Sequence, residues 1–185
     1  MVKGAATSVV CATYNLQPTS VLWKAMVFLA QERPGVAVRL YVDTQAADGR
    51  FAGAGRSRRT PGLRPGARGG RQAGGRGGRQ AGGMGAGVAA SRGSALSTGD
   101  MARGLTGAVV MRTRAPRQGE RPVTSHAKFL SVDHRYLLVG SANFSRSAEE
   151  RNVELGLRVD DPALAASVEK QMRDLEANVY ERVMP

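Results

Sequence analysis

The sequence predicts an α/β fold in which a mixed β-sheet is flanked by helices and interrupted by a long Gly/Arg-rich insert. Short apolar, β-branched runs alternate with amphipathic helical patterns near both ends of the 185-residue chain, as in layered α/β domains. The charge is concentrated between them, because residues 50–121 hold 15 Arg, no Lys and two acids, a net +13, whereas the other 113 residues total −1. The overall charge of +12 therefore belongs to one segment, and the remainder has an ordinary globular composition.

These shifts in composition divide the chain into three parts, of which the first and third form one domain. Residues 1–48 are expected to be its N-terminal βαβ part, and residues 107–185 its C-terminal part. Residues 49–106 form the Gly/Arg-rich low-complexity insert, although residues 96–111 can supply a short helix and a strand.

The N-terminal part reads as strand, helix and strand. Val9–Tyr14 is apolar and β-branched, which is typical of a buried strand. Ser20 can cap a helix that continues to Gln31, where Arg33-Pro34-Gly35 stops it. The apolar face of this helix follows the i, i+3, i+4, i+7 pattern, with Leu22, Ala25, Met26 and Leu29. Alternation over Val36–Val42 predicts a second strand, and the crossover helix implies that the two strands are parallel.

The insert contains two copies of Gly-Gly-Arg-Gln-Ala-Gly-Gly, at residues 69–75 and 77–83, and hardly any bulky apolar side chain. Such a sequence buries too little apolar surface to offset the entropy of ordering, so we expect it to be disordered. Three interpretations stay open. Its Arg-Gly-Gly tracts can bind single-stranded nucleic acid through charge and stacking, it can be a solvated insert without a specific role, or it can be a sequence artefact that replaces a normal stretch.

The C-terminal part is expected to contain further strands and one long helix. The strand candidates are residues 108–111, 128–132, 136–139 and 153–159. Asp133-His134-Arg135 separates the second and third of these as a tight hairpin turn. Asp161 and Pro162 are a good N-cap and first residue for an amphipathic helix of about 18 residues by its apolar period.

Several classes of protein are excluded by composition. The single Cys11 excludes a disulfide framework, and with only two His in the chain it also excludes a Cys/His zinc site. No apolar run approaches the roughly 18–20 residues of a membrane span, and the apolar stretch near the N-terminus is too short for a signal peptide. We therefore expect a soluble, cytoplasmic protein.

The candidate chemistry lies at the start of the C-terminal part. His126 and Lys128 are expected on one face of a strand, because strand side chains alternate. Ser141 and Asn143 follow the next strand, so strand pairing would bring an imidazole, an ammonium, a hydroxyl and a carboxamide to one edge. This set suits a phosphate, with Lys, Ser and Asn binding its oxygens and His as nucleophile or general acid/base. Glu154 can accept from the far imidazole nitrogen and fix its tautomer.

Each of these residues by itself also has an ordinary structural explanation. A lone His-x-Lys is usually an exposed pair on the surface, residues 141–145 can be a turn with local caps, and Asp133 can be a turn residue. The fixed spacing of the whole set is what favours a site. The set consists of His126, Lys128, Asp133, Gly140, Ser141 and Asn143.

This spacing resembles the signature of the phospholipase D superfamily, His-x-Lys, four residues, Asp, six residues, Gly-Ser-x-Asn. Here it stands as His126-Ala127-Lys128, Asp133 and Gly140-Ser141-Ala142-Asn143. The similarity extends to Ser145, Ala148, Asn152 and Glu154, and to the opening unit with Tyr14-Asn15 and residues 35–43. The resemblance implies a phospholipase D-like sheet and a phosphodiesterase of the HKD type.

The resemblance also implies a mechanism, in which one His attacks a phosphodiester and forms a phosphohistidine without any metal or other cofactor. A second His, from a second motif, protonates the leaving group. Carried over, His126 is nucleophile or acid, Lys128 and Asn143 bind the phosphoryl oxygens, Ser141 and Asp133 organise the site, and Glu154 orients His126. Because the chain has one copy of the motif, a complete site requires a homodimer.

Three functions stay open. The first is a metal-independent nuclease on DNA or RNA, similar to small bacterial endonucleases or to phospholipase D-like proteins of bacterial DISARM-type defence systems. The second is a phospholipase D or transphosphatidylase acting on phospholipid. The third is a non-enzymatic nucleic-acid-binding protein that uses its Arg/Gly tract. Nucleic acid is the favoured partner besides a second copy of the chain.

Overall fold

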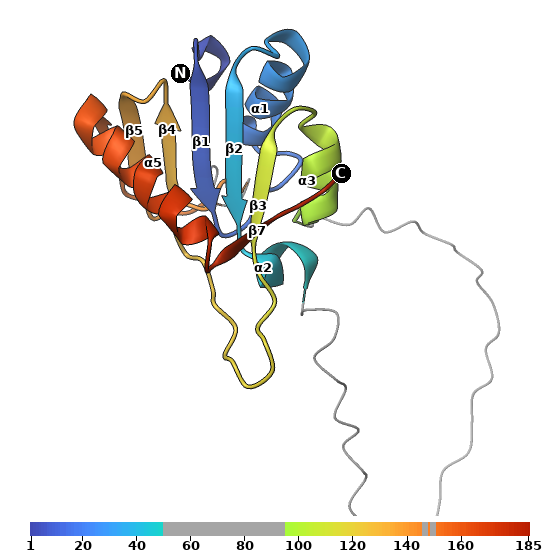
Figure 1. Cartoon of the computed structure of the whole chain (residues 1–185). Helices are drawn as coiled ribbons and strands as arrows, with labels where there is room; N and C mark the ends of the chain where they lie inside the picture. Colours follow the sequence, from blue (N-terminus) through green and yellow to red (C-terminus); the bar gives the residue numbers. More distant parts are fainter. Residues whose placement is uncertain (50–94, 146–147, 149–150) are drawn as a thin grey trace, which may run out of the picture. The chain divides into compact units, whose positions relative to one another are not determined.

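A mixed seven-stranded β-sheet organises the part of the chain that the structure, a computed structural model, describes: residues 1–49, 95–145, 148 and 151–185. The sheet order is β6-β5-β4-β1-β2-β3-β7 (Figure 1). The strands are β1 Ser8–Thr13, β2 Ala37–Val42, β3 Val109–Thr113, β4 Phe129–Val132, β5 Tyr136–Gly140, β6 Gly156–Asp160 and β7 Tyr180–Arg182. Strands β1, β2 and β3 are parallel, and the other pairings are antiparallel. The predicted α/β fold with a mixed sheet is confirmed.

The N-terminal strand–helix–strand unit forms as the sequence predicts. Helix α1 (Val21–Glu32) begins at Ser20, whose hydroxyl oxygen accepts from the backbone N–H of Trp23 at 3.1 Å. The apolar positions of the predicted face are buried: Leu22, Ala25, Met26 and Leu29. The crossover returns the chain in parallel, with Ser8 opposite Ala37. A short 3-10 turn, η1 (Val2–Gly4), precedes the unit.

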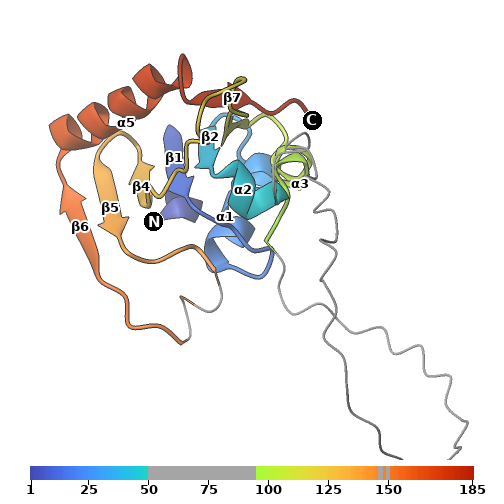
Figure 2. The ribbon, with the colours of Figure 1, turned by 90° about the horizontal axis from the view of Figure 1, so that it is seen from below.

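Both faces of the sheet are covered, which explains why every residue of β1 is buried. Val9 and Cys11 pack on the side of α1 and α3 (Thr98–Gly104), whereas Val10 and Ala12 face the side of α5 (Pro162–Glu176). Figures 1 and 2 show α5 on one face of the sheet and α1 with α3 on the other. The N-cap of α5 is Asp161, as predicted, and the helix has 15 residues.

The β4–β5 hairpin turns at the expected residues. Asp133 and His134 have φ angles of 55° and 52°, and the N–H of Arg135 donates to the carbonyl oxygen of Val132 at 3.2 Å. Two successive positive φ angles define a type I′ turn, the type that matches the twist of paired strands. Asp and His tolerate this backbone conformation better than most residues, so the sequence is locally consistent with the hairpin.

The structure describes the C-terminal end of the predicted insert, from residue 95, but not its central part. Residues 50–94 lie outside the described residues, and with them the two repeats. The upper boundary at residue 106 is corrected, because Thr98–Gly104 form α3, with the Ser97 hydroxyl oxygen as N-cap acceptor at 3.1 Å from the N–H of Asp100. Residues 96–111 thus supply the short helix and strand that the sequence allows.

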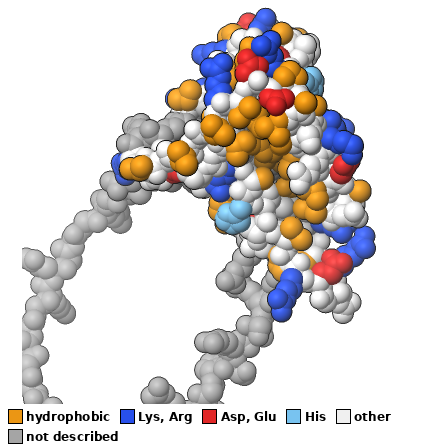
Figure 3. All heavy atoms as spheres, turned by 90° about the vertical axis from the view of Figure 1, so that its left-hand side faces the viewer, with side chains coloured by type: hydrophobic (Ala, Val, Ile, Leu, Met, Phe, Trp, Pro, Cys, Tyr) orange, Lys and Arg blue, Asp and Glu red, His pale blue; other side chains and the backbone are white. Residues whose placement is uncertain are grey.

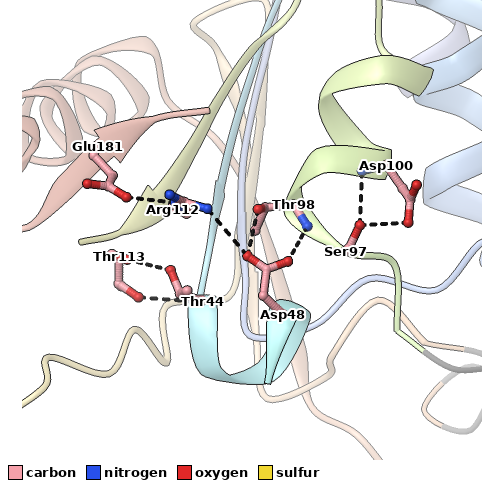
Figure 4. Close-up of polar contacts among 8 residues, drawn as sticks. All are labelled: Thr44, Asp48, Ser97, Thr98, Asp100, Arg112, Thr113 and Glu181. Atoms are coloured by element: carbon pink, nitrogen blue, oxygen red, sulfur yellow. Dashed lines mark hydrogen bonds and ion pairs between the residues drawn. The ribbon is translucent and has the colours of Figure 1, made fainter. Parts of the chain in front are cut away.

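Asp48 and Thr98, which flank residues 50–94 in the sequence, lie side by side (Figure 4). Asp48, the last residue of α2 (Thr44–Asp48), accepts from the backbone N–H and the hydroxyl of Thr98, both at 2.7 Å. Arg112 of β3 lies 3.7 Å from the same carboxylate and 2.7 Å from Glu181 of β7. We name the Asp48–Thr98 contact the clasp, because it joins α2 to the residue that begins α3, on either side of residues 50–94 in the sequence.

Two elements near the C-terminus differ from expectation. Strand β6 begins at Gly156 rather than at residue 153, since its partner β5 ends at Gly140, opposite Gly156. Val153 and Leu155 are therefore exposed despite their alternating pattern. Strand β7 is not predicted, because three residues are too short for a recognisable pattern, and its pairing with β3 depends on tertiary structure.

Candidate functional site

The motif residues gather at one edge of the sheet, with one exception. This edge holds the C-terminal ends of β1, β2, β3 and β5 and the beginnings of β4 and β6, and Figure 2 looks onto it. His126 and Lys128 directly precede β4, Ser141 and Asn143 follow β5, and Glu154 precedes β6. Antiparallel pairing of three successive strands thus places these five side chains on neighbouring segments.

The segment that carries His126 is fixed by buried hydrogen bonds. The N–H of Ser125 donates to Oδ2 of Asp43 at 2.9 Å, and the hydroxyls of Ser125 and Tyr180 lie 2.7 Å apart. Asp43 is fully buried at the end of β2, where its other oxygen caps α2 through the N–H of Ala46. Groups at the end of β2 and on β7 therefore determine where the residue before the motif histidine lies.

His126 is exposed and stacks on Tyr14, the residue that follows β1. The ring centroids are 4.6 Å apart and the planes are inclined by 15°. This contact joins the opening unit of the domain to the motif, and the residue pattern gives no sign of it, since Tyr14 is 112 positions away. The stack restricts the orientation of the imidazole ring.

The strand argument for His126 and Lys128 needs a correction. Strand β4 begins at Phe129, so both residues precede the strand instead of sharing one of its faces. Lys128 still takes part in the hairpin, because its carbonyl oxygen accepts from the N–H of Gly140 at 3.3 Å. Its ammonium donates to the carbonyl oxygen of His126 at 3.2 Å, so the two residues are adjacent by this contact.

Ser141 and Glu154 form a pair across β5 and β6. The Ser141 hydroxyl donates to Oε2 of Glu154 and accepts from the N–H of Leu155 at 3.2 Å. Asn152 donates to Oε1 of Glu154 at 3.1 Å. The hydrogen bonds from Ser141 and Asn152, with the nearby charge of Lys128, hold the pKa of Glu154 below its ordinary value, so the carboxylate is ionised at neutral pH.

Both oxygens of Glu154 are thus engaged by residues other than His126. The expected contact between Glu154 and the histidine is not formed among the described residues of a single chain. Gly140 explains the glycine of the motif, because a Cβ there would lie 2.8 Å from the carbonyl oxygen of Leu155. The close approach of β5 and β6 beside the Ser141–Glu154 pair therefore requires glycine.

Asn143 lies next to the contact between the first and third parts of the domain. Its neighbour Phe144 bridges with Leu16, which brings the loop after β5 beside the loop after β1. The side-chain oxygens of Asn143 and Asn15 are buried and have no hydrogen-bond partner within the described ranges. Buried amide oxygens without hydrogen-bond partners are unusual in proteins. Of these two residues, the sequence predicts only Asn143 as a site residue.

A small pocket at this edge has Lys128 and Glu154 among its lining residues. Its lining combines these charged groups with apolar and glycine surfaces: Lys128, Leu138, Gly140, Ala142, Phe144, Glu154, Leu155 and Gly156. Within the described ranges no three His, Cys, Asp or Glu side chains are grouped so that they could hold a metal ion. The groups present at this edge, an imidazole, an ammonium, a hydroxyl, carboxamides and a carboxylate, suit an oxyanion.

Asp133 is the exception, because the fold does not bring it to the edge where the other motif residues lie. It lies at the opposite end of β4, about 17 Å from Lys128 at the usual rise per residue. Its carboxylate accepts from the N–H groups of Ala6, Thr7 and Ser8 at 2.8–3.2 Å and from the Thr7 hydroxyl at 3.1 Å. Partial burial raises the pKa of Asp133, but these hydrogen bonds outweigh it and hold the pKa below its ordinary value. Asp133 therefore secures the start of β1.

Comparison with known proteins agrees with the sequence motif. A family model described as "Cardiolipin synthase, PLD-like domain" matches residues 1–175. Among curated proteins, none matches the chain significantly. No helix among the described residues is long and apolar enough to cross a membrane.

Solved structures share the fold at low sequence identity. NucT from Helicobacter pylori is 15% identical with a TM-score of 0.59, over 96% of this chain and 84% of that one. Nuc from Salmonella typhimurium, a phospholipase D family member, is 20% identical with a TM-score of 0.55, over 100% and 86%. Phosphatidylserine synthase from Haemophilus influenzae is 17% identical with a TM-score of 0.56, over 97% of this chain and 34% of its own length.

These likenesses show the fold, and the family model covers most of the chain including the motif. Phosphodiester chemistry is the general reaction of the family that this model describes. With the fold, the edge cluster and the matched residues in agreement, the chain belongs to the phospholipase D-like family.

Proposed function

We propose that the protein is a phosphodiester hydrolase that acts on nucleic acid through a phosphohistidine intermediate. The observation that carries the proposal is the presentation of His126, exposed, stacked on Tyr14 and adjacent to the Lys128 ammonium, at the edge where the Ser141–Glu154 pair lies. An exposed imidazole, with an ammonium group bound to the carbonyl oxygen of the same residue, is suited to attack a phosphorus atom whose charge the cation offsets.

In the proposed reaction, an imidazole nitrogen of His126 attacks phosphorus and the bond to one ester oxygen breaks. The departing alkoxide takes a proton from a second histidine, and the phosphoryl group remains on His126. Water then attacks the phosphohistidine, loses its proton to the second histidine, and releases the phosphate monoester. One imidazole must be neutral and the other protonated, so the rate is expected to follow a bell-shaped pH profile.

The remaining groups would bind and position. Lys128 and Asn143 would bind the non-bridging phosphoryl oxygens, as cation and neutral donor. Ser141 and Glu154 would fix the segment beside them. Asp43 and Ser125, through their buried hydrogen bond, act as positioning residues, because they hold the backbone that presents the nucleophile.

The second histidine would come from a second copy of the chain. His134 does not qualify, because it lies at the hairpin turn, with Nδ1 2.7 Å from Glu169. An exposed apolar strip beside the site supports a two-fold dimer, and it follows β5 and the edge strand β6 (Figure 3). Its residues are 43–104% exposed: Val139, Val153, Leu155 and Leu157.

The test is cleavage of single- and double-stranded DNA and of RNA by the full chain in excess EDTA. We expect cleavage that survives the chelator and falls at least about 10³-fold in His126→Ala. The matched control is His134→Asn, which removes the other histidine and keeps a residue that tolerates a positive φ.

Three results would contradict the proposal. Loss of activity in EDTA would exclude the metal-independent mechanism, and faster headgroup release from phosphatidylcholine liposomes than cleavage of nucleic acid would favour the lipid alternative. Equal activity of His126→Ala and the wild type would remove the histidine from the chemistry. Sedimentation of the same samples tests the dimer, because a monomer with full activity would contradict a shared site.

A further inference from the structure

The loop that leads from β3 to the motif histidine, residues 114–124, carries three arginines close together. Arg117 and Arg121 are exposed and Arg114 is half-buried, and the loop contains one acid, Glu120. Figure 1 shows this segment extending beyond the site edge of the sheet, below α2. Long loops without secondary structure in a compact domain are commonly functional.

Both ends of the loop are fastened, so its position relative to the site is set by the fold. At the exit from β3, the N–H of Arg114 donates to the carbonyl oxygen of Val179 at 2.9 Å. At the return, Ser125 is held by Asp43 and Tyr180. Within this loop, the residues between Arg114 and Ser125 are the part that extends from the domain.

The tip of the loop is a defined turn. The N–H of Glu120 donates to the carbonyl oxygen of Arg117 at 2.9 Å, and Gly119 has a φ of 85°, as the third residue of a type II turn requires. The Glu120 carboxylate accepts from the backbone N–H of Arg117 at 3.0 Å. The only acid of the loop is therefore engaged with its backbone, not with a guanidinium group.

The three loop arginines differ from most arginines elsewhere in the domain. Arg39, Arg103, Arg112, Arg135 and Arg173 each pair with a carboxylate. Within the described ranges, Arg114, Arg117 and Arg121 have no such partner, so their guanidinium groups are available to an external anion. A planar guanidinium pairs with phosphate through two parallel hydrogen bonds.

We propose that the 114–124 loop binds the backbone phosphates of a nucleic-acid strand whose scissile phosphate lies at His126. Arg121 is five residues from His126, a span of at most about 18 Å. Arginines spaced three and four residues apart match a ligand with repeating phosphates, whereas a phospholipid carries one diester. The inference rests on the proposed function and names its substrate as a polynucleotide.

The test compares two substrates that share the reaction and differ in length. For Arg114→Ala/Arg117→Ala/Arg121→Ala in the full chain, kcat/KM is measured on a single-stranded hexanucleotide and on bis(p-nitrophenyl) phosphate. We expect the ratio of the two values to fall at least tenfold. Each lost phosphate contact also lowers the slope of log Kd against log salt by about 0.7 for a single strand, so three contacts lower it by about 2.

The matched control is Arg103→Ala/Arg135→Ala/Lys170→Ala, which removes three exposed, ion-paired cations outside the loop and gives the same net charge. We expect the control to change the ratio less than twofold. An equal effect of both triple variants, or no effect of the loop variant, would overturn the inference.

Failure of the proposed function is distinguishable from failure of the loop assignment. If neither substrate is cleaved by the wild type, the hydrolase proposal fails, and binding of a labelled hexanucleotide still tests the loop. Unchanged hexanucleotide affinity in the loop variant would then overturn it. Weakened binding to phosphatidylglycerol vesicles with unchanged hexanucleotide affinity would assign the loop to a lipid surface and also overturn the inference.

Discussion

The two ends of the β4–β5 hairpin each carry a histidine close to a charged residue, and they use these side chains in opposite ways. At the turn end, Asp133 is saturated by backbone amides and His134 pairs with the buried Glu169. At the other end, His126 has an aromatic ring as its side-chain contact, and Lys128 uses one of its three N–H donors on a carbonyl oxygen.

This difference shows how one short motif serves two purposes. Side chains whose hydrogen-bonding groups are all used within the chain stabilise the fold. Side chains with unused hydrogen-bonding groups can bind a substrate. One motif contains both kinds of side chain, and the four residues of β4 place them at opposite ends of the strand. Substitutions at the two ends should therefore separate activity from stability.

After His126→Ala, the largest effect is expected at the same site end of the hairpin, for Lys128→Ala. Removing the cation that would offset phosphoryl charge should lower kcat by about 10²–10³-fold, with little change in the free energy of unfolding, since the ammonium makes one exposed hydrogen bond. Steady-state hydrolysis of bis(p-nitrophenyl) phosphate together with urea denaturation checks this. Lys170→Ala, an exposed ion pair on α5, is the control. A drop in stability that accounts for the lost rate would contradict the separation.

A smaller effect, on stability instead of activity, is expected at the turn end of the hairpin, for Asp133→Asn. Loss of the charged acceptor of three amides should lower the free energy of unfolding by about 1–3 kcal/mol, while the folded fraction keeps the wild-type kcat. Denaturant titration at pH 7 measures the first and active-site-normalised rates the second. A selective loss of kcat would return Asp133 to the chemistry.

The same variant has a pH signature. Because the folded-state pKa of Asp133 lies below its unfolded value, its stabilising contribution is fully present above that unfolded value, near 4. The contribution is lost as pH falls through the still lower folded pKa. The stability difference between wild type and Asp133→Asn should therefore shrink between pH 5 and pH 2, and a constant difference would argue against the carboxylate as its source.

The smallest effect concerns Tyr14, which contacts the site from the opposite part of the domain. Loss of the ring stack in Tyr14→Ala should lower kcat by up to about tenfold, since such stacks contribute about 0.5–1.5 kcal/mol. Tyr14→Phe keeps the stack and should change kcat less than twofold. Equal losses in both variants would point to the hydroxyl instead of the ring.

Local signals in the sequence predict much of the fold. The capped helix, the alternating strand at residues 36–42 and the turn at Asp133-His134 each carry their own pattern, and all three form. Strand β7 and the later start of β6 depend on the partner strand and on where it ends. No local pattern contains that information.

The site is likewise predicted only in part, because the motif residues are predicted from the sequence and their partners from other strands are not. Spacing predicts that His126, Lys128, Ser141, Asn143 and Glu154 meet at one edge, and the hairpin brings them there. The role of Asp133 is missed because spacing shows that residues belong to one motif, not at which end of a strand each lies. The partners Tyr14, Asp43 and Tyr180 are missed because they come from other strands of the sheet.

The clasp between Asp48 and Thr98 bears on how this domain tolerates change in its length. The clasp holds two points that are 50 positions apart in the sequence. For a flexible connection in general, the entropy of bringing its ends together depends only logarithmically on its length. Doubling or halving that length alters the free energy of closure by about 0.6 kcal/mol, which is within the range that a single hydrogen bond contributes. We therefore expect changes in the number of residues between Asp48 and Thr98 to leave the sheet and the edge that carries the motif unchanged.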